Sequence, residues 1–217
     1  LESLDVPAFK IASLECTDLP LIRRVAQTQK PIIISTGTAT LSEIEEAVET
    51  ARGAGCKDIA ILKCTTTYPA SPENSNLRTI AHMKDAFGCE VGLSDHTMGC
   101  GTSVAAVAVG ATIIEKHFTI RRADGGVDSQ FSLEPEEFAT LVVEVKRAWQ
   151  SLGKILYGPS NAEINARNRR RSLYIADDLQ VGDLLTSGNI RRIRPGNGID
   201  CKYYDLVIGR RIKCEVK

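Results

Sequence analysis

Short apolar runs alternate with longer amphipathic stretches over roughly the first 155 residues. The apolar runs recur about every 20 to 30 residues and are rich in β-branched side chains, as in PIII from Pro31. This alternation is typical of parallel strands joined by helices, and continuous apolar strands are those covered on both faces. We therefore predict an α/β fold with strands at residues 8–13, 31–36, 59–64, 90–94 and 112–118.

An amphipathic helix is predicted after each strand. The second has a recognisable start, because Ser42 and Glu45 have the spacing of a capping box. Its apolar face is followed by glycines that predict its end. The predicted helices cover residues 19–28, 42–54, 77–87, 101–109 and 135–152.

The pattern changes after Gly153. Residues 156–171 combine a Gly-Pro pair with polar residues and the basic run Arg169–Arg171, which predicts a linker. From Ser172 onward, short apolar pieces are separated by turn residues, which predicts a small β-rich module over residues 172–217. A module of this size has a marginal core, so we expect it to lean on a larger partner.

Composition narrows the class of protein. The 217 residues carry 27 Lys plus Arg and 27 Asp plus Glu, so no overall field favours nucleic acid or a membrane. The longest apolar stretch, residues 103–114, is too short to span a bilayer. Seven cysteines without a CxxC pair favour a reducing, cytoplasmic compartment. The chain shows no signal peptide and no initiator methionine, so we expect a piece of a longer protein.

The predicted strands end in polar residues, which is where barrel proteins gather their functional groups. His96 and His117 follow adjacent strands, so their imidazoles could share a metal ion or be two separately satisfied rim histidines. His82, among polar helix residues, is predicted to be at the surface. Lys10 and the serines and threonines of these ends could bind a phosphate or carboxylate, or could simply cap helices. The glycine-rich loop 122–129 could cover the site, with Asp124 and Asp128 accepting sugar hydroxyls, or be a solvated turn.

Taken in order, the strand-end strings FKIASLE, PIIISTGTAT, KCTTTYPAS, VGLSDHTMG and IIEKHFT resemble the sialic acid synthase family. The string RPGNGID in the last module is similar to the SAF, or antifreeze-like, domain of that family. The resemblance spans nearly the whole chain. It implies the last five strands or so of a TIM-type (βα) barrel in residues 1–155, followed by an incomplete β-clip SAF domain in residues 172–217.

The resemblance also implies a reaction: phosphoenolpyruvate condenses with an amino-sugar aldehyde, and phosphate leaves by C–O cleavage. His96 and His117 would be catalytic metal ligands, with Mn²⁺ the usual ion and Mg²⁺ or Co²⁺ possible. Glu15 matches an active-site carboxylate. Arg194 matches an arginine that reaches the partner's barrel in a domain-swapped homodimer. The residues expected to bind phosphoenolpyruvate are Lys10, Ser13, Ser35, Thr66 and Ser94, and those expected at the sugar are Tyr68, Asp128 and Arg194.

The segment FTIRRADGGVDSQFSLEPEEF looks closer to pseudaminic acid synthases, whose sugar is a 2,4-diacetamido-2,4,6-trideoxy hexose. N-acetylneuraminate or legionaminate synthase is the enzyme alternative, and a noncatalytic sugar- or phosphate-binding fragment is the alternative of another class. An ice-binding tail is disfavoured because RRIRPG is strongly charged. Family members begin with about three further strands, one with a glutamate for the attacking water, so we expect this piece alone to be inactive.

Overall fold

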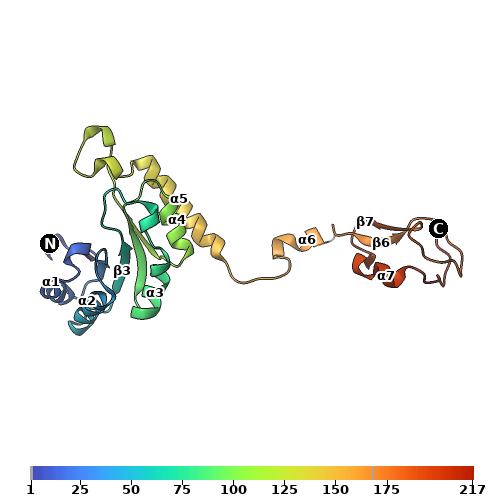
Figure 1. The fold of residues 1–217 in the computed structure, drawn as a ribbon, viewed down its shortest axis with the longest axis horizontal. Helices are drawn as coiled ribbons and strands as arrows, with labels where there is room; N and C mark the ends of the chain where they lie inside the picture. Colours follow the sequence, from blue (N-terminus) through green and yellow to red (C-terminus); the bar gives the residue numbers. More distant parts are fainter. Residues whose placement is uncertain (1, 168) are drawn as a thin grey trace. The chain divides into compact units, whose positions relative to one another are not determined.

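The computed structural model describes residues 2–167 and 169–217. Its internal contacts divide the chain into two compact units, Leu1–Gly153 and Lys154–Lys217, which are described separately (Figure 1). Among the described helices, none is long and apolar enough to cross a membrane.

The first unit is built on a parallel sheet of five strands that follow one another in chain order. Each predicted strand is present, although the first, second and last are shorter than expected. The sheet is curled, because Lys10 Nζ on the first strand lies 3.4 Å from Glu115 Oε1 on the last. It is therefore half of a barrel. The strands are β1 (Phe9–Ile11), β2 (Ile32–Ser35), β3 (Ile59–Cys64), β4 (Glu90–Asp95) and β5 (Ile113–Lys116).

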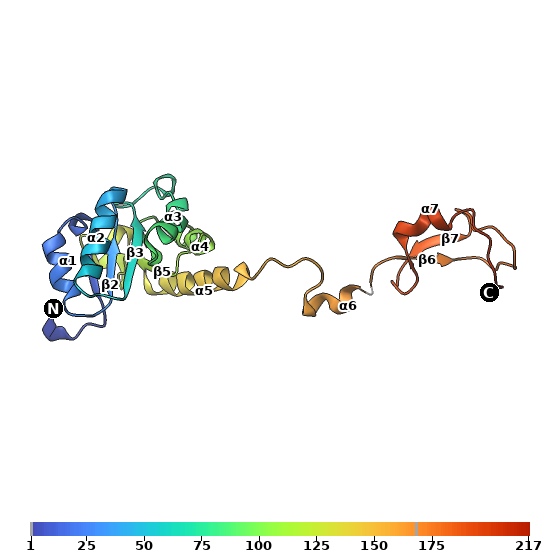
Figure 2. The ribbon, with the colours of Figure 1, turned by 90° about the horizontal axis from the view of Figure 1, so that it is seen from below.

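A helix follows each strand and packs its apolar face against the sheet or a neighbouring helix, and Figure 2 shows α1 and α2 side by side. Fully buried Ile22, Ile61 and Met83 belong to the core between these layers. The helices are α1 (Leu19–Ala26), α2 (Leu41–Gly53), α3 (Arg78–Phe87), α4 (Gly101–Ala108) and α5 (Pro135–Leu152).

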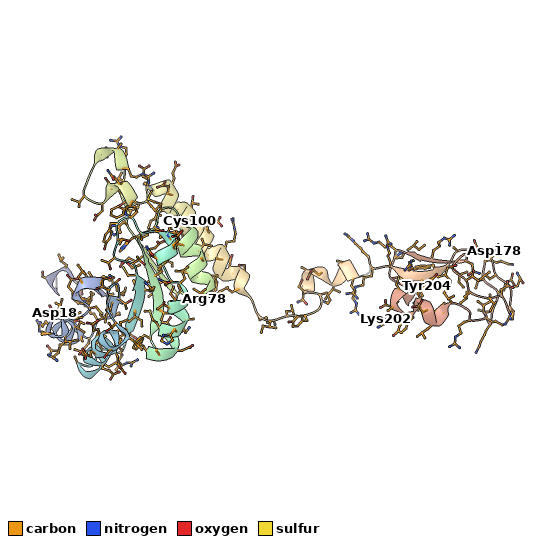
Figure 3. All side chains as sticks on the ribbon, in the orientation of Figure 1. Asp18, Arg78, Cys100, Asp178, Lys202 and Tyr204 are labelled. Carbon is orange, nitrogen blue, oxygen red and sulfur yellow. The ribbon has the colours of Figure 1, made fainter. Side chains whose placement is uncertain are left out.

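The start of α2 corrects the predicted capping box. Thr40, not Ser42, is the N-cap: its hydroxyl accepts the Glu43 N–H at 3.3 Å, and the Glu43 carboxylate accepts the Thr40 N–H at 2.7 Å. Two overlapping Ser/Thr-x-x-Glu patterns fit this stretch, and the upstream one starts the helix two residues earlier, with a backbone bond from Ile44 N–H to the Thr40 carbonyl. The start of α1 is capped by Asp18, which accepts the Leu21 N–H at 3.0 Å (Figure 3).

The second unit contains a small antiparallel sheet in the order β7-β6-β8. Leu173, Leu179 and Ile190 form its buried apolar centre. The Arg192 guanidinium lies 5.1 Å from the centre of the Tyr204 ring, which is labelled in Figure 3. The predicted linker contains two helical turns. The elements are η6 (Asn161–Glu163), α6 (Ile164–Arg167), β6 (Ser172–Ile175), β7 (Ile190–Ile193), β8 (Ile199–Asp200), η7 (Cys201–Tyr203) and α7 (Tyr204–Val207).

Candidate active site

The register between β4 and β5 aligns two tripeptides, Ser94-Asp95-His96 and Glu115-Lys116-His117. Ser94 is opposite Glu115, and Asp95 is opposite Lys116. Because successive side chains of a strand point to opposite faces, the first and third residues of each tripeptide share one face. On that face the Ser94 hydroxyl donates to Glu115 Oε1 at 2.6 Å, and the His96 and His117 ring centroids lie 5.1 Å apart. The register thus brings the predicted histidines together.

His96 is held in a defined orientation. It is buried, with Nδ1 2.8 Å from the Thr65 carbonyl oxygen. A carbonyl can only accept, so Nδ1 carries the proton and the neutral ring has its lone pair on Nε2. Burial alone would lower the pKa of His96, but the Cys64 and Thr65 contacts outweigh it and raise this pKa above its usual value.

His117 is more open, with 31% of its side chain exposed. Its Nδ1 lies 3.8 Å from Asp128 Oδ2. Burial and the nearby charge of His96 lower the pKa of His117, which favours the neutral, ligand-competent ring.

The histidine pair fits a metal ion that keeps open positions. Two imidazoles bound through nitrogens ~2.1 Å from one ion have centroids roughly 5 Å apart, and the observed separation is 5.1 Å. The bond from His96 Nδ1 to a carbonyl is the usual outer support of a metal-binding imidazole. Within the described residues, no group of three or more His, Cys, Asp and Glu side chains is arranged around an ion, so water and substrate oxygens would complete the coordination.

Two unpartnered hydroxyls lie at the ends of β2 and β3 in the same sheet. Ser35 Oγ and Thr66 Oγ1 are buried, and neither makes a hydrogen bond with the described residues. Gly37 lets Ser13 and Thr66 approach one another: a Cβ there would lie 2.3 Å from Thr66 Oγ1 and 2.4 Å from Ser13 Cβ. Buried polar atoms without partners are costly, so a ligand that accepts their protons is a physical reason for their presence.

Cys64 lies among the same strand ends, with Sγ 3.9 Å from His96 Nδ1. Burial by itself would raise the pKa of this thiol. Hydrogen bonds with His96, Ser13 and Ser94 outweigh the burial and lower the pKa of Cys64 to about 7. Groups from η2, from β4 and from the residue after β4 therefore meet at the sulfur atom at the end of β3.

An aromatic group forms the outer part of the site. Tyr68 is half-exposed, and its ring centroid lies 4.3 Å from that of His96 and 5.8 Å from that of His117. Phe131, in η5 (Ser129–Phe131), packs edge-on against His117 at 5.1 Å and also contacts Tyr68. The open face beside Tyr68 and Asp128 could take a polar ligand with an apolar side.

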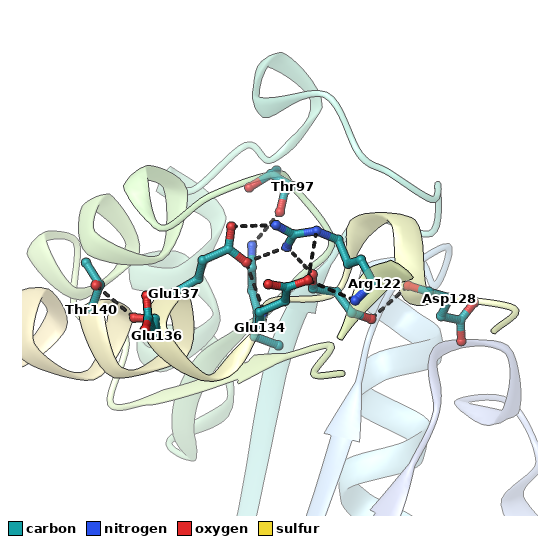
Figure 4. Close-up of polar contacts among 9 residues, drawn as sticks. Thr97, Arg122, Asp128, Glu134, Glu136, Glu137 and Thr140 are labelled. Atoms are coloured by element: carbon teal, nitrogen blue, oxygen red, sulfur yellow. Dashed lines mark hydrogen bonds and ion pairs between the residues drawn. The ribbon is translucent and has the colours of Figure 1, made fainter. Parts of the chain in front are cut away.

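The loop that carries Asp128 and Phe131 is tied to the start of α5. The Arg122 side chain bonds both Glu137 oxygens, one at 2.9 Å, and donates to the Ser132 carbonyl at 3.0 Å. Its backbone N–H donates to Glu134 Oε1 at 2.8 Å (Figure 4).

Two predicted residues are not drawn into this cluster. Glu15, in η2 (Ser13–Glu15), is exposed, and its side chain makes no hydrogen bond or ion pair with the described residues. Arg194 belongs to the second unit. Four residues of the cluster, in turn, were not among the predicted site residues: Gly37, Cys64, Glu115 and Phe131. Glu115 could have been found, because it precedes His117 by two positions on a strand and so shares its face.

A curled parallel sheet with paired histidines and unpartnered hydroxyls at its strand ends defines a small-molecule site of the βα-barrel class. The NeuB family model matches residues 1–157, and the chain belongs to the NeuB family. It is similar to a pseudaminic acid synthase of Helicobacter pylori, with 39% identity over 97% of this chain and 62% of that protein. It is equally similar to an N,N'-diacetyllegionaminic acid synthase of Campylobacter jejuni, with 40% identity over 97% of this chain and 64% of that protein.

Among solved structures, the N-acetylneuraminic acid synthetase of Leptospira borgpetersenii, in complex with citrate, matches with a TM-score of 0.71 and 36% identity. The match covers 77% of this chain and 60% of that one. The predicted family and the barrel-type fold are confirmed. The chain spans somewhat less than two thirds of the length of the curated relatives it matches.

Proposed function

We propose that the protein containing this chain condenses phosphoenolpyruvate with a 2,4-diacetamido-2,4,6-trideoxy hexose, as a pseudaminic acid synthase does. The observation that carries the proposal is that the unpartnered Ser35 and Thr66 hydroxyls and the His96–His117 pair lie at strand ends of the same curled sheet. An anion-binding part and a metal-binding part are what this condensation needs.

His96 and His117 would hold the divalent ion, which we propose to be Mn²⁺, through Nε2 of His96 and a ring nitrogen of His117. When bound, the ion would act as a Lewis acid on the aldehyde oxygen of the sugar. The Thr65 carbonyl fixes the His96 ring, and the lowered pKa of His117 keeps its lone pair available at neutral pH. The Tyr68 ring covers both imidazoles.

The hydroxyls of Ser13, Ser35 and Thr66 would donate to the phosphate and carboxylate of phosphoenolpyruvate, and Lys10 would supply a positive charge. Ser94, whose hydroxyl donates to Glu115 in this structure, would turn its proton to the ligand when it binds. C3 of phosphoenolpyruvate then bonds to the aldehyde carbon, water adds at C2, and the C–O bond to phosphate breaks. We keep Glu15 as the proposed catalytic carboxylate. Its side chain is exposed in this structure.

Tyr68 and Asp128 would bind the sugar, because an exposed ring and a carboxylate flank His117. We assign residues 172–217 to a SAF domain that delivers Arg194 to the barrel of a partner subunit in a domain-swapped dimer. Charge supports this pairing: residues 154–217 carry 13 Lys plus Arg against 7 Asp plus Glu, and residues 1–153 carry 14 against 20. The two units therefore have opposite net charges, which would favour docking between subunits.

The metal part of the proposal is tested on the 217-residue chain. Mn²⁺ binding should be measured calorimetrically for the wild type, His96→Ala and His117→Ala. We expect each variant to lose binding, whereas His82→Ala, an exposed histidine on α3, should bind as the wild type does. Binding that survives both substitutions would contradict the assignment.

The reaction is tested on the complete gene product that contains this chain. It should be incubated with phosphoenolpyruvate, Mn²⁺ and each candidate amino sugar, with phosphate release and product mass as readouts. We expect turnover with the trideoxy sugar of pseudaminic acid synthesis. Turnover with the legionaminate precursor instead would favour the second candidate, which the 40% identity to a legionaminic acid synthase supports. Metal binding without turnover of any sugar would favour a binding protein.

A further inference from the structure

A buried ion pair lies directly behind the two histidines. Lys116 Nζ lies 2.9 Å from Asp95 Oδ2, and only 1% of each side chain is exposed. The two residues are register partners on β4 and β5 and point to the face opposite the histidines. Nothing in the proposed chemistry uses either charge.

The polar contacts of this pair connect the strand ends with α4. Asp95 Oδ1 accepts the Thr97 N–H at 2.8 Å and the Thr97 hydroxyl at 2.7 Å. Asp95 Oδ2 accepts the hydroxyl of fully buried Ser103 on α4 at 2.6 Å. Lys116 also donates to the Thr97 carbonyl, and Thr97 is labelled in Figure 4. The network therefore joins β4, β5 and α4.

We propose that Asp95 and Lys116 are positioning residues that set the distance and orientation of the His96 and His117 rings for metal binding. His96 lies between Asp95 and Thr97, which belong to one network, so its backbone is fixed on both sides. His117 directly follows Lys116. The two histidine carbonyls are also bonded, to the N–H groups of Ala70 and Leu133, both at 2.9 Å. The rings thus extend from a backbone whose register the buried pair locks.

A contribution to the stability of the fold does not by itself explain why this ion pair is buried. A buried ion pair gives up the hydration of two charges, and apolar residues of similar volume often stabilise a core as well or better. A network in which all four acceptor sites of a carboxylate are used has directionality that apolar packing lacks. Register between two strands that each deliver a metal ligand is a property that needs such directionality.

The test compares the wild type with the double variant Asp95→Asn/Lys116→Met. This variant removes both charges but keeps the volumes of the two side chains and one acceptor oxygen at position 95. Single substitutions would leave one buried charge unpaired and lose the fold, so the double variant is the informative one. We expect a wild-type circular dichroism spectrum and a dissociation constant for Mn²⁺ that is 10- to 100-fold higher, the range for loss of an outer-shell partner. Glu144→Gln/Arg147→Met, which removes an exposed ion pair on α5, is the matched control and should change neither.

A second readout is independent of the metal. The ¹⁵N shifts of the histidine rings in the metal-free protein should show one His96 tautomer in the wild type and a mixture in the double variant. A folded double variant with wild-type Mn²⁺ affinity and ring shifts overturns the proposal. If the double variant fails to fold, Ser103→Ala decides instead: several-fold weaker Mn²⁺ binding supports the proposal and unchanged binding overturns it.

The positioning role depends on the proposed function only in assuming that a metal ion binds the two histidines. The positioning role and the proposed function can therefore be contradicted separately. A wild-type chain that binds no Mn²⁺ contradicts the proposed metal site. The ring shifts of the double variant would then still decide the positioning role, because they require no metal.

Discussion

Removal of one atom, Ser35 Oγ, should have different effects on phosphoenolpyruvate binding and on the stability of the fold. Its Oγ is buried and makes no hydrogen bond, so Ser35→Ala removes an unsatisfied group and should leave the free energy of unfolding unchanged or raised by up to ~1 kcal/mol. The same change should weaken phosphoenolpyruvate binding about 10-fold, because one donor to a charged ligand is lost. Urea unfolding and calorimetric titration measure the two effects.

The neighbouring Thr36 is the matched control for that change. Its buried hydroxyl donates to the Leu62 carbonyl at 3.1 Å, so Thr36→Val should cost ~1 kcal/mol of stability. A Ser35→Ala variant that loses as much stability as Thr36→Val would mean that the Ser35 hydroxyl has a partner in the folded chain.

We predict that glycine is required at position 37 because there is no room for a side chain, and not because of the backbone conformation. A methyl group would lie within 2.6 Å of three atoms of Ser13 and Thr66, so Gly37→Ala should destabilise the chain by ~1–3 kcal/mol through overpacking. Gly53→Ala at the end of α2, where no atom lies within 4 Å, should be neutral or stabilising by ~0.5–1 kcal/mol. Thermal and urea unfolding of the two variants check this contrast, and equal effects would contradict it.

At the scale of elements, the ion pair of Arg122 with Glu137 ties the loop with Asp128 and Phe131 to α5. The hydrogen bond from Arg122 and the backbone N–H of Glu134 lower the pKa of Glu137 to about 2. A depressed carboxyl pKa stabilises the fold above the unfolded-state value, near 4.5, and that contribution is lost as pH falls towards 2. Arg122→Met should therefore lower the urea midpoint slightly at pH 6, since solvent screens the pair, and the difference should shrink below pH 4.

The control for that measurement is Arg121→Met, which removes a more exposed pair with Asp124 in the same loop. It should shift the midpoint less than Arg122→Met does. A difference between Arg122→Met and the wild type that grows on acidification would contradict the assigned sign.

The sequence predicted strands and helices well, because the spacing of apolar residues and the runs of β-branched residues can be read from neighbouring positions in the chain. It misplaced the start of α2 by two residues, since Thr40 and Ser42 both fit a capping box and only the folded chain selects one. It did not find Phe131, because η5 has no periodic pattern and its position depends on Arg122 contacts across the loop. The meeting of His96 and His117 was predictable only as neighbouring strand ends, since the register was not readable from the chain.

At the scale of the whole molecule, the expected site residues are divided between the two units. Family resemblance predicted that Arg194 enters a partner's barrel, and this stays a prediction because the residue belongs to the unit Lys154–Lys217. The first unit, by contrast, assembles residues from all five strands at one edge of its sheet. The metal and anion parts of the proposed site therefore belong to a single compact unit.

The open sheet leads to the last prediction, that the 217-residue chain binds Mn²⁺ but releases no phosphate from phosphoenolpyruvate. β1 and β5 each pair on one side only, so the half-barrel leaves the site open between them. Tyr68 is 51% exposed and the Asp128 side chain 53% exposed, whereas phosphate chemistry benefits from a site that excludes water. Phosphate release should be followed with Mn²⁺ and each amino sugar, beside the complete gene product as the positive control. Release by the short chain above that of His96→Ala would show that half a barrel suffices for the reaction.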